Sequence, residues 1–153
     1  MGLPPFQEFL DANRSTVYRF LLVAVGSTEA DDVFQETFIA ALRAYPRLHH
    51  GESLDRWVLR IASRKALDHH RSTGRRAVPT DVLSDRPTDA PAEPDEELWK
   101  AVRDLPPRQR VALVHRHVLD RPYAEIAHFM GSSEQTARAN VSHAIRRLRE
   151  VLT

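Results

Sequence analysis

The sequence predicts an all-α protein of two small helical domains joined by an acidic, proline-rich linker. Three observations predict this fold class. Apolar residues recur at helical spacing along most of the chain, and no stretch alternates as a half-buried strand would. The chain has 153 residues, which suits one ordinary domain or two very small ones. Between two basic blocks lies a segment with few large apolar residues, which cannot offset the entropy lost on ordering.

The charge distribution divides the chain into the same three parts. The formal net charge is only +1, but residues 1–76 hold 11 basic and 9 acidic residues, and residues 98–153 hold 10 basic and 5 acidic ones. Residues 77–97 hold 1 basic and 7 acidic residues, together with four of the ten prolines. Such a segment favours an extended, self-repelling chain. We therefore expect domains at 1–76 and 96–153, with residues 77–95 as the linker.

Three helices are predicted in the first block. The first runs from Phe6 to a break at Gly26, and the second has Ser27 or Thr28 as its N-cap and stops before Pro46. The third is predicted over residues 53–72, with Ser53 as its N-cap. The expected core residues are Phe6, Phe9, Leu10, Val17, Phe20, Leu21 and Ala24 in the first helix, Ala30, Val33, Phe34, Thr37, Phe38, Ala41 and Leu42 in the second, and Leu54, Trp57, Val58, Ile61 and Ala62 in the third.

The second block is predicted to hold three or four helices. A short amphipathic helix over 96–105 ends at a proline pair, and Pro107 suits the first turn of the next helix. A short helix then leads to a turn at Gly131, which favours the left-handed conformation, and to a long helix capped by Ser133. The expected apolar residues are Leu98, Trp99 and Val102, then Val111, Ala112, Val114, His115 and Val118, then Ala124, Ile126, Ala127 and Met130, and finally Ala137, Val141, Ile145, Leu148 and Leu152.

The helix–turn–helix pattern over residues 123–152 is the strongest local signal for a function. At 3.6 residues per turn, one face of the last helix carries Gln135, Arg138, Ser142, Arg146 and Arg149. The first turns of a recognition helix enter the major groove, where Gln and Arg can form paired hydrogen bonds to base edges. The alternative is a solvated face whose basic residues complement the helix C-terminus. We favour DNA binding.

A second basic stripe lies on the third helix. Five arginines fall within about 100° of arc around that helix and flank Trp57; they are Arg56, Arg60, Arg64, Arg71 and Arg75. Arginines beside an aromatic ring suit a single strand of nucleic acid, because the bases stack on rings and the phosphates meet guanidinium groups. Taken alone, the pattern slightly favours a solvated face with Trp57 in the core.

Several classes of function are excluded. The absence of cysteine excludes disulfides, thiolate zinc sites and a cysteine nucleophile. None of the eight histidines has the H-E-x-x-H spacing, and no P-loop or nucleophile elbow occurs, so we expect no metal, no cofactor and no catalysis. No apolar run approaches the ~20 residues needed to span a bilayer, and Glu8 and Asp11 oppose a signal peptide. We expect a cytoplasmic protein without membrane contact.

Five short motifs, in order, resemble the extracytoplasmic-function (ECF) sigma factors of bacterial RNA polymerase. They are D-x-x-Q-E-T-F from Asp32, R-I-A from Arg60, L-P-x-x-Q-R from Leu105, Y-x-E-I-A from Tyr123 and R-R-L-R from Arg146. Each motif is weak alone, and the combination covers nearly the whole chain apart from the acidic segment. The resemblance implies sigma domain two in the first block and a helix-turn-helix sigma domain four in the second.

The resemblance also implies roles for particular residues. The outer face of the second helix would bind core RNA polymerase through Asp32, Gln35, Glu36, Ile39 and Arg43. The minus-ten element would be opened, and its non-template strand held, by His49, His50, Arg56, Trp57, Arg60, Arg64 and Arg71. The duplex minus-thirty-five element would be read by Ser133, Gln135, Thr136, Arg138, Ser142 and Arg146.

The expected function is therefore that of a sigma factor, which is not an enzyme and directs promoter-specific transcription by core RNA polymerase. Family members are often held by an anti-sigma protein, which makes such a protein a candidate partner. Two alternatives stay open. One is a stand-alone helix-turn-helix regulator, which leaves the polar face of the second helix unexplained. The other is an interaction module that titrates a partner without binding DNA.

Overall fold

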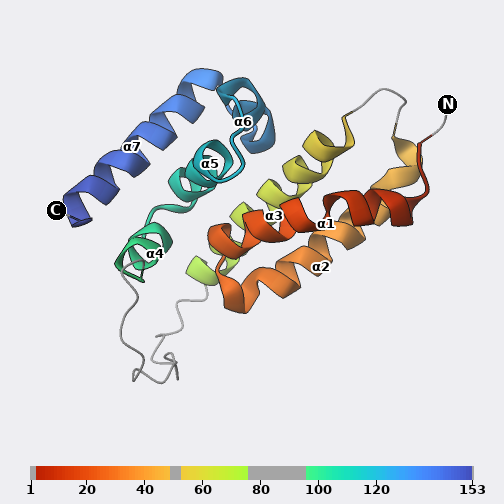
Figure 1. The fold of residues 1–153 in the computed structure, drawn as a ribbon, viewed down its shortest axis with the longest axis horizontal. Helices are drawn as coiled ribbons and strands as arrows, with labels where there is room; N and C mark the ends of the chain where they lie inside the picture. The colour runs from red at the N-terminus through yellow and green to blue at the C-terminus, as the bar shows by residue number, and fades with distance from the viewer. Residues whose placement is uncertain (1–2, 49–52, 76–95, 153) are drawn as a thin grey trace.

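The computed structural model describes residues 3–48, 53–75 and 96–152, with only the helical backbone for 71–75. Within those ranges the chain forms seven α-helices, one 3₁₀ helix and no strand (Figure 1), which confirms the predicted all-α class. The elements are α1 (Phe6–Ala24), α2 (Ser27–Ala44), η1 (Tyr45–Arg47), α3 (Leu54–Arg75), α4 (Glu96–Arg103), α5 (Pro107–His117), α6 (Tyr123–Met130) and α7 (Glu134–Leu152). The predicted linker, residues 77–95, lies outside the described residues.

The first three helices pack against one another and form the N-terminal group, α1–α3. Their centre is aromatic, because the fully buried ring of Phe9 lies 5.4 Å from Tyr45, 5.5 Å from Trp57 and 6.2 Å from Phe38, measured between ring centroids. These tilted contacts are the geometry that aromatic pairs prefer. They fix the end of α2 and the start of α3 against α1, which positions both predicted functional faces of this group.

The prediction that Ser27 or Thr28 caps α2 is wrong. The N-cap is Gly26, and Ser27 is already the first helical residue. Gly26 has a φ of 91°, a backbone conformation that side chains disfavour, and its carbonyl accepts the first helical hydrogen bond from the Ala30 amide at 3.0 Å. The tight reversal between α1 and α2 therefore decided the helix start, and no side-chain hydroxyl was required.

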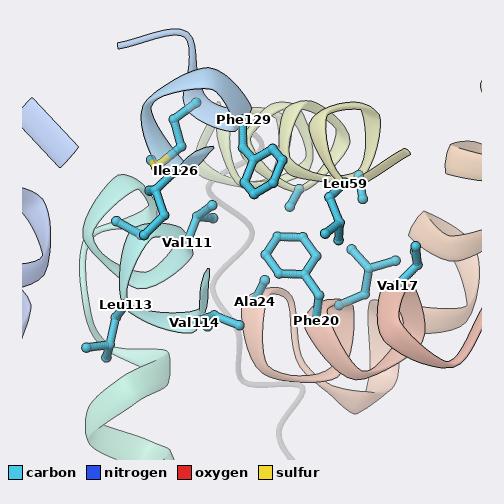
Figure 2. Packing of buried hydrophobic residues seen from close by; sticks show 14 of the residues in the cluster. Val17, Phe20, Ala24, Leu59, Val111, Leu113, Val114, Ile126 and Phe129 are labelled. Atoms are coloured by element: carbon cyan, nitrogen blue, oxygen red, sulfur yellow. The ribbon is translucent and has the colours of Figure 1, made fainter. Parts of the chain in front are cut away.

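Helix α5 lies between the N-terminal group and α7 (Figure 1), and its middle is buried on all sides. Six consecutive residues from Arg110 to His115 are buried, whereas a helix that packs on one side only leaves a polar face in water. Both groups of helices therefore share one hydrophobic cluster. Figure 2 shows Phe20 of α1 and Phe129 of α6 pointing toward each other across the contact between the groups.

The C-terminal group, α4–α7, contains the predicted helix–turn–helix. Gly131 ends α6 with a φ of 61°, and the Ser132 amide donates to the Ala127 carbonyl at 3.0 Å, as in a Schellman cap. The Ser133 hydroxyl accepts the Thr136 amide at 3.0 Å and caps α7. Pro107 occupies the first position of α5. These three local predictions are confirmed.

Several residues named for the apolar faces of the predicted helices are exposed, including two that were predicted to be buried, Leu42 and Leu152. The exposed fractions of Leu42 and Leu152 are 53% and 41%, and Leu98 and Trp99 of α4 are also exposed. Leu42 lies at the edge of the apolar stripe of α2, beside the exposed Ile39 and Arg43, and Leu152 belongs to the last turn of α7. Ala124, at the start of α6, is likewise exposed. Conversely, the buried Leu59, Ala66 and Ala144 were not predicted.

Candidate nucleic-acid interfaces

The outer face of α7 is hollowed and basic. A hollow of about 400 Å³ is lined by Tyr123 of α6 and by α7 side chains, among them Arg138, Ser142, Arg146 and Arg149. No carboxylate of the described residues lines it, so it favours an anionic partner such as a nucleic-acid backbone. All six residues predicted for minus-thirty-five recognition are exposed, and three of them (Arg138, Ser142 and Arg146) meet at this hollow.

The first turn of α7 holds the other predicted residues. Ser133 and Thr136 are engaged in the helix cap, since their hydroxyls also lie within 2.9 Å of each other. Gln135 is exposed beside them. Capping therefore accounts for Ser133 and Thr136 structurally, and the side chains that project for contact are Gln135, Arg138, Ser142 and Arg146.

Arg138 is held by two neighbours from different helices. Its Nη2 donates to the Glu134 carboxylate at 2.9 Å, one turn earlier on α7. Its guanidinium carbon lies 4.4 Å from the centroid of the Tyr123 ring, and so does that of Arg116 on α5. Sequence reasoning missed Tyr123 and Arg116, although Tyr123 opens the Y-x-E-I-A motif. Three different helices supply these residues, so no single periodicity reveals the cluster.

The arginine stripe of α3 is exposed at Arg56, Arg60 and Arg64, as predicted. Trp57 is half-buried, with one part packed against Phe9 and the other lining a cavity of about 750 Å³ between α3 and α6. His49, His50 and the side chain of Arg71 lie outside the described residues. Trp57 therefore packs in the core, as one interpretation of the arginine stripe expected. It also keeps part of its ring accessible, as the nucleic-acid interpretation requires.

The cavity beside Trp57 is shared between the two groups of helices. Arg56 and Arg60 line it from α3, while Glu125 and His128 line it from α6. The start of α3 is also tied to the C-terminal group, because Arg121 Nη1 donates to the Asp55 carboxylate at 3.0 Å and lies 3.4 Å from that of Glu125. In this arrangement α6 therefore lies against the predicted minus-ten surface.

The carboxylate of Asp55 is held in its charged form. Burial raises its pKa, but hydrogen bonds from the Ser53 hydroxyl, the Arg121 guanidinium and the Arg56 amide, together with the Arg121 charge, leave the pKa below its usual range. The ion pair with Arg121 is therefore present at neutral pH.

A buried histidine joins the two groups at their centre. The His115 ring stacks on Phe20 of α1 at 4.5 Å and lies 4.6 Å from Phe129 of α6, between ring centroids. The Ser63 hydroxyl lies 2.7 Å from both the Leu59 carbonyl and His115 Nε2. A hydroxyl has one hydrogen, which the carbonyl takes, so Nε2 carries the proton that is donated to Ser63. Burial lowers the pKa of His115 to about 3, and the ring is neutral.

The end of α1 is capped by one side chain from each group of helices. The Ala24 carbonyl accepts hydrogen bonds from Arg110 Nη1 at 3.0 Å and from His70 Nε2 at 2.7 Å. Arg110 also donates to the carbonyls of Leu105, at 3.1 Å, and of Arg103. Burial lowers the pKa values of Arg110 and His70. One buried guanidinium, in the L-P-x-x-Q-R motif, thus fixes the turn after α4 and the contact with α1.

The outer face of α2 presents all the residues predicted to bind polymerase. Two apolar side chains, Ile39 and Leu42, are 49% and 53% exposed and lie next to charged neighbours. The predicted residues on this face are all exposed, and they are Asp32, Gln35, Glu36, Ile39 and Arg43. Apolar residues bordered by charges are typical of protein interfaces. We refer to these five residues and Leu42 as the α2 face.

Among the described residues, no cluster of histidine, aspartate and glutamate has the geometry to hold a metal ion. Within the same ranges, no helix combines the length and the apolar character needed to cross a bilayer.

Known protein families match both groups of helices. The family model of Sigma-70 region 2 matches residues 9–76, and that of Sigma-70, region 4 matches residues 95–148. The chain is similar to the ECF RNA polymerase sigma factor SigC of Mycobacterium tuberculosis, with 32% identity over 90% of this chain and 78% of SigC. It is equally similar to SigD of the same species, with 32% identity over 94% of this chain and 75% of SigD.

A solved structure shows the same fold. The sigma factor RpoE of Bartonella quintana, crystallised with the anti-sigma factor NepR, matches with a TM-score of 0.77 and 22% identity. The match covers 96% of each chain. The arrangement of helices described above therefore occurs in a protein of very different sequence.

Proposed function

This chain belongs to the ECF RNA polymerase sigma factors, and on that premise we propose how its residues divide the work of binding polymerase and recognising a promoter. Sigma factors bind core RNA polymerase and promoter DNA, and they are in general not enzymes. We assign residues 1–76 to polymerase binding and the minus-ten element, 77–95 to a linker, and 96–153 to the minus-thirty-five element.

The α2 face is the proposed docking surface for core RNA polymerase. The observation that supports this assignment is that two apolar side chains, Ile39 and Leu42, are exposed on one face of α2. The polar and charged side chains beside them are exposed as well, and they are Asp32, Gln35, Glu36 and Arg43. A monomer gains nothing from leaving both Ile39 and Leu42 in water, whereas a partner that covers them gains apolar burial. The charged border then selects the orientation of the partner.

The minus-ten element is proposed to meet the exposed arginines of α3 beside Trp57. Arg56, Arg60 and Arg64 present a row of charges for the phosphates of a melted strand, and the accessible part of the Trp57 ring is suited to stacking with a base. His49, His50 and Arg71 complete the assignment from the sequence.

The minus-thirty-five element is proposed to lie along the hollow of α7. A guanidinium such as that of Arg138 can donate to two acceptors of guanine at once, and Ser142 and Arg146 lie around the same hollow. Gln135 is placed on the first turn, where recognition helices meet base edges. Ser133 and Thr136 support this contact by capping the helix.

Transcription in vitro tests the proposed function. Purified core RNA polymerase is incubated with a genomic promoter library, with and without the full chain, and transcript starts are mapped. We expect the chain to direct initiation at a defined subset of promoters. Tight, sequence-specific binding of promoter duplex by the isolated chain, with no effect on polymerase, would instead support a stand-alone regulator.

We also propose an anti-sigma protein as a partner and the bacterial cytoplasm as the location. The first rests on RpoE, which was crystallised with an anti-sigma factor, and the second on the need to reach polymerase and promoter DNA together.

A further inference from the structure

The Tyr123 ring lies where three helices of the C-terminal group meet at the DNA-facing hollow. It is half-buried at the first position of α6, and it supplies the wall of the hollow opposite the α7 side chains. The guanidinium carbons of Arg116, from α5, and Arg138, from α7, both lie 4.4 Å from its centroid. Two like charges have therefore been brought to one aromatic ring.

We propose that Tyr123 is a positioning residue for promoter recognition, whose ring holds the Arg138 guanidinium ready for the minus-thirty-five bases. The proposal rests on the proposed function of α7 and adds to it a residue outside the recognition helix. Tyr123 acts through Arg138, so its loss should weaken discrimination between promoters more than transcription as such.

The geometry of a guanidinium explains why a ring is suited to this task. Its N–H donors all lie in one plane, and an aromatic ring attracts the cation through the face of that plane. Stacking on Tyr123 therefore leaves the donor edges available. Glu134 acts differently, because its carboxylate occupies an N–H of Arg138 at 2.9 Å. A base that takes this N–H displaces Glu134 but has no need to displace Tyr123.

The two arginines depend on the ring to different degrees. Arg116 is half-buried, and its Nη1 also donates to the Arg121 carbonyl at 3.2 Å, so this hydrogen bond helps to keep it in place without the ring. Arg138 is exposed, and its guanidinium is paired with the Glu134 carboxylate and stacked on the Tyr123 ring, with no backbone hydrogen bond found among the described residues. Removing the ring should therefore release Arg138 first, toward the carboxylate of Glu134.

The first measurement uses the full chain without DNA or polymerase. Arginine Nε–H resonances near an aromatic ring are displaced by its ring current, so the wild-type spectrum should contain two displaced signals. Tyr123→Phe should keep them, and Tyr123→Leu, which fills a similar volume without a ring, should return both to ordinary positions. Unaltered signals in Tyr123→Leu would overturn the contact on which the proposal stands.

The second measurement uses the full chain with core RNA polymerase, on promoters that differ only in the minus-thirty-five element. The quantity is the ratio of transcription from the preferred element to that from an altered one. We expect Tyr123→Phe to match the wild type, and Tyr123→Leu to lower the ratio about two- to fivefold, the factor that an exposed cation–π contact is worth. Adding Tyr123→Leu to Arg138→Ala should lower it no further.

Control variants separate the possible failures. If Arg138→Ala lowers the ratio and Tyr123→Leu does not, the positioning role is overturned while the function of α7 stands. If Arg138→Ala leaves the ratio unchanged, base reading by Arg138 is wrong and the role of Tyr123 falls with it. Equal losses in Tyr123→Phe and Tyr123→Leu would assign the effect to the hydroxyl and overturn the role of the ring. Thermal unfolding of each variant checks that the fold is intact.

Discussion

At the scale of single residues, two buried polar side chains hold the contact between the groups of helices. His115 is neutral and enclosed by Phe20, Phe129 and Ser63, with the Arg121 charge also acting on it. Burial lowers its pKa to about 3, whereas an exposed imidazole has a pKa of about 6.5. Protonation therefore favours any state in which His115 reaches water, and the packed state is fully stable only above pH ~6.5.

We predict that acid weakens the packing around His115. At pH 5.5, about one unit below the pKa of exposed histidine, the free energy of unfolding should fall by ~1.4 kcal/mol from this residue alone. Denaturant unfolding between pH 7.5 and 5.5 measures the effect, and His115→Phe is the control that keeps a stacking ring without titrating. His70, whose pKa is also lowered, adds a change in the same direction to both proteins. An equal pH dependence in the two proteins would contradict the prediction.

Arg110 is the second such residue. We predict that Arg110→Met lowers the free energy of unfolding by ~1–3 kcal/mol, because the carbonyls of Ala24 and Leu105 lose a buried donor. Arg108→Met is the matched control, since Arg108 is exposed and donates to one carbonyl, that of Met130. Urea unfolding compares the two, and similar losses would show that the burial of Arg110 confers no special role.

At the scale of the helix, one face of α2 is buried in the core, and the opposite face is proposed to bind polymerase. We predict that Asp32→Lys with Glu36→Lys abolishes binding to core RNA polymerase and changes the free energy of unfolding by no more than ~0.5 kcal/mol, because both side chains are exposed. Co-purification with core enzyme measures binding. Glu8→Lys with Asp11→Lys makes the same charge change on the exposed side of α1 and should leave binding intact. If the α2 variant still binds core RNA polymerase, the α2 face is not the docking surface.

The turn between α6 and α7 gives a prediction at the same scale. Gly131 has a φ of 61°, and a Cβ added there meets no atom within 4 Å, so Gly131→Ala should cost only the backbone strain, ~1 kcal/mol. Gly131→Asn should cost less, because asparagine tolerates the left-handed region. Thermal unfolding ranks the three proteins. A larger loss for asparagine than for alanine would indicate that side-chain crowding, and not φ, limits the turn.

At the scale of the whole molecule, the packed arrangement cannot bridge a promoter. Elements centred at minus ten and minus thirty-five lie about 25 base pairs apart, or ~85 Å along the duplex at 3.4 Å per base pair. A compact chain of this length has a radius of gyration of about 15 Å. In the packed arrangement, moreover, α6 lies against the α3 surface assigned to the minus-ten element. On the assignment proposed above, the two groups must separate for both elements to be bound at once.

We predict that this separation is measurable by distance labelling. The chain lacks cysteine, so Ser15→Cys on α1 and Glu150→Cys on α7 introduce two unique labelling sites. Energy transfer between the labels should be high in the free protein and should fall sharply in the complex with polymerase and promoter. The pair Ser15→Cys and Ser27→Cys, within the N-terminal group, should show no change. Equal transfer in the free and bound states would contradict the opening.

The sequence by itself determined the helices, several of their ends and most of the exposed side chains that are proposed to bind polymerase and DNA. Helical periodicity depends on each segment alone, so it located α2 and the exposed residues on its outer face. The Gly131 turn and the Ser133 cap were predictable for the same reason, since both are satisfied by neighbours within a few residues. The motifs then indicated the family, and the family matches confirmed it.

Only the tertiary structure decided which helix covers which. Leu42 lies at the edge of the apolar stripe of α2, and the burial of an edge residue depends on where a neighbouring helix packs. The prediction that Leu42 is buried was therefore wrong. The burial of α5 from Arg110 to His115 and the meeting of Arg116 and Arg138 at Tyr123 likewise require segments that are distant in sequence to come together. Periodicity shows which face of a helix prefers to be buried. Which other helix packs on that face is decided only when the whole chain folds.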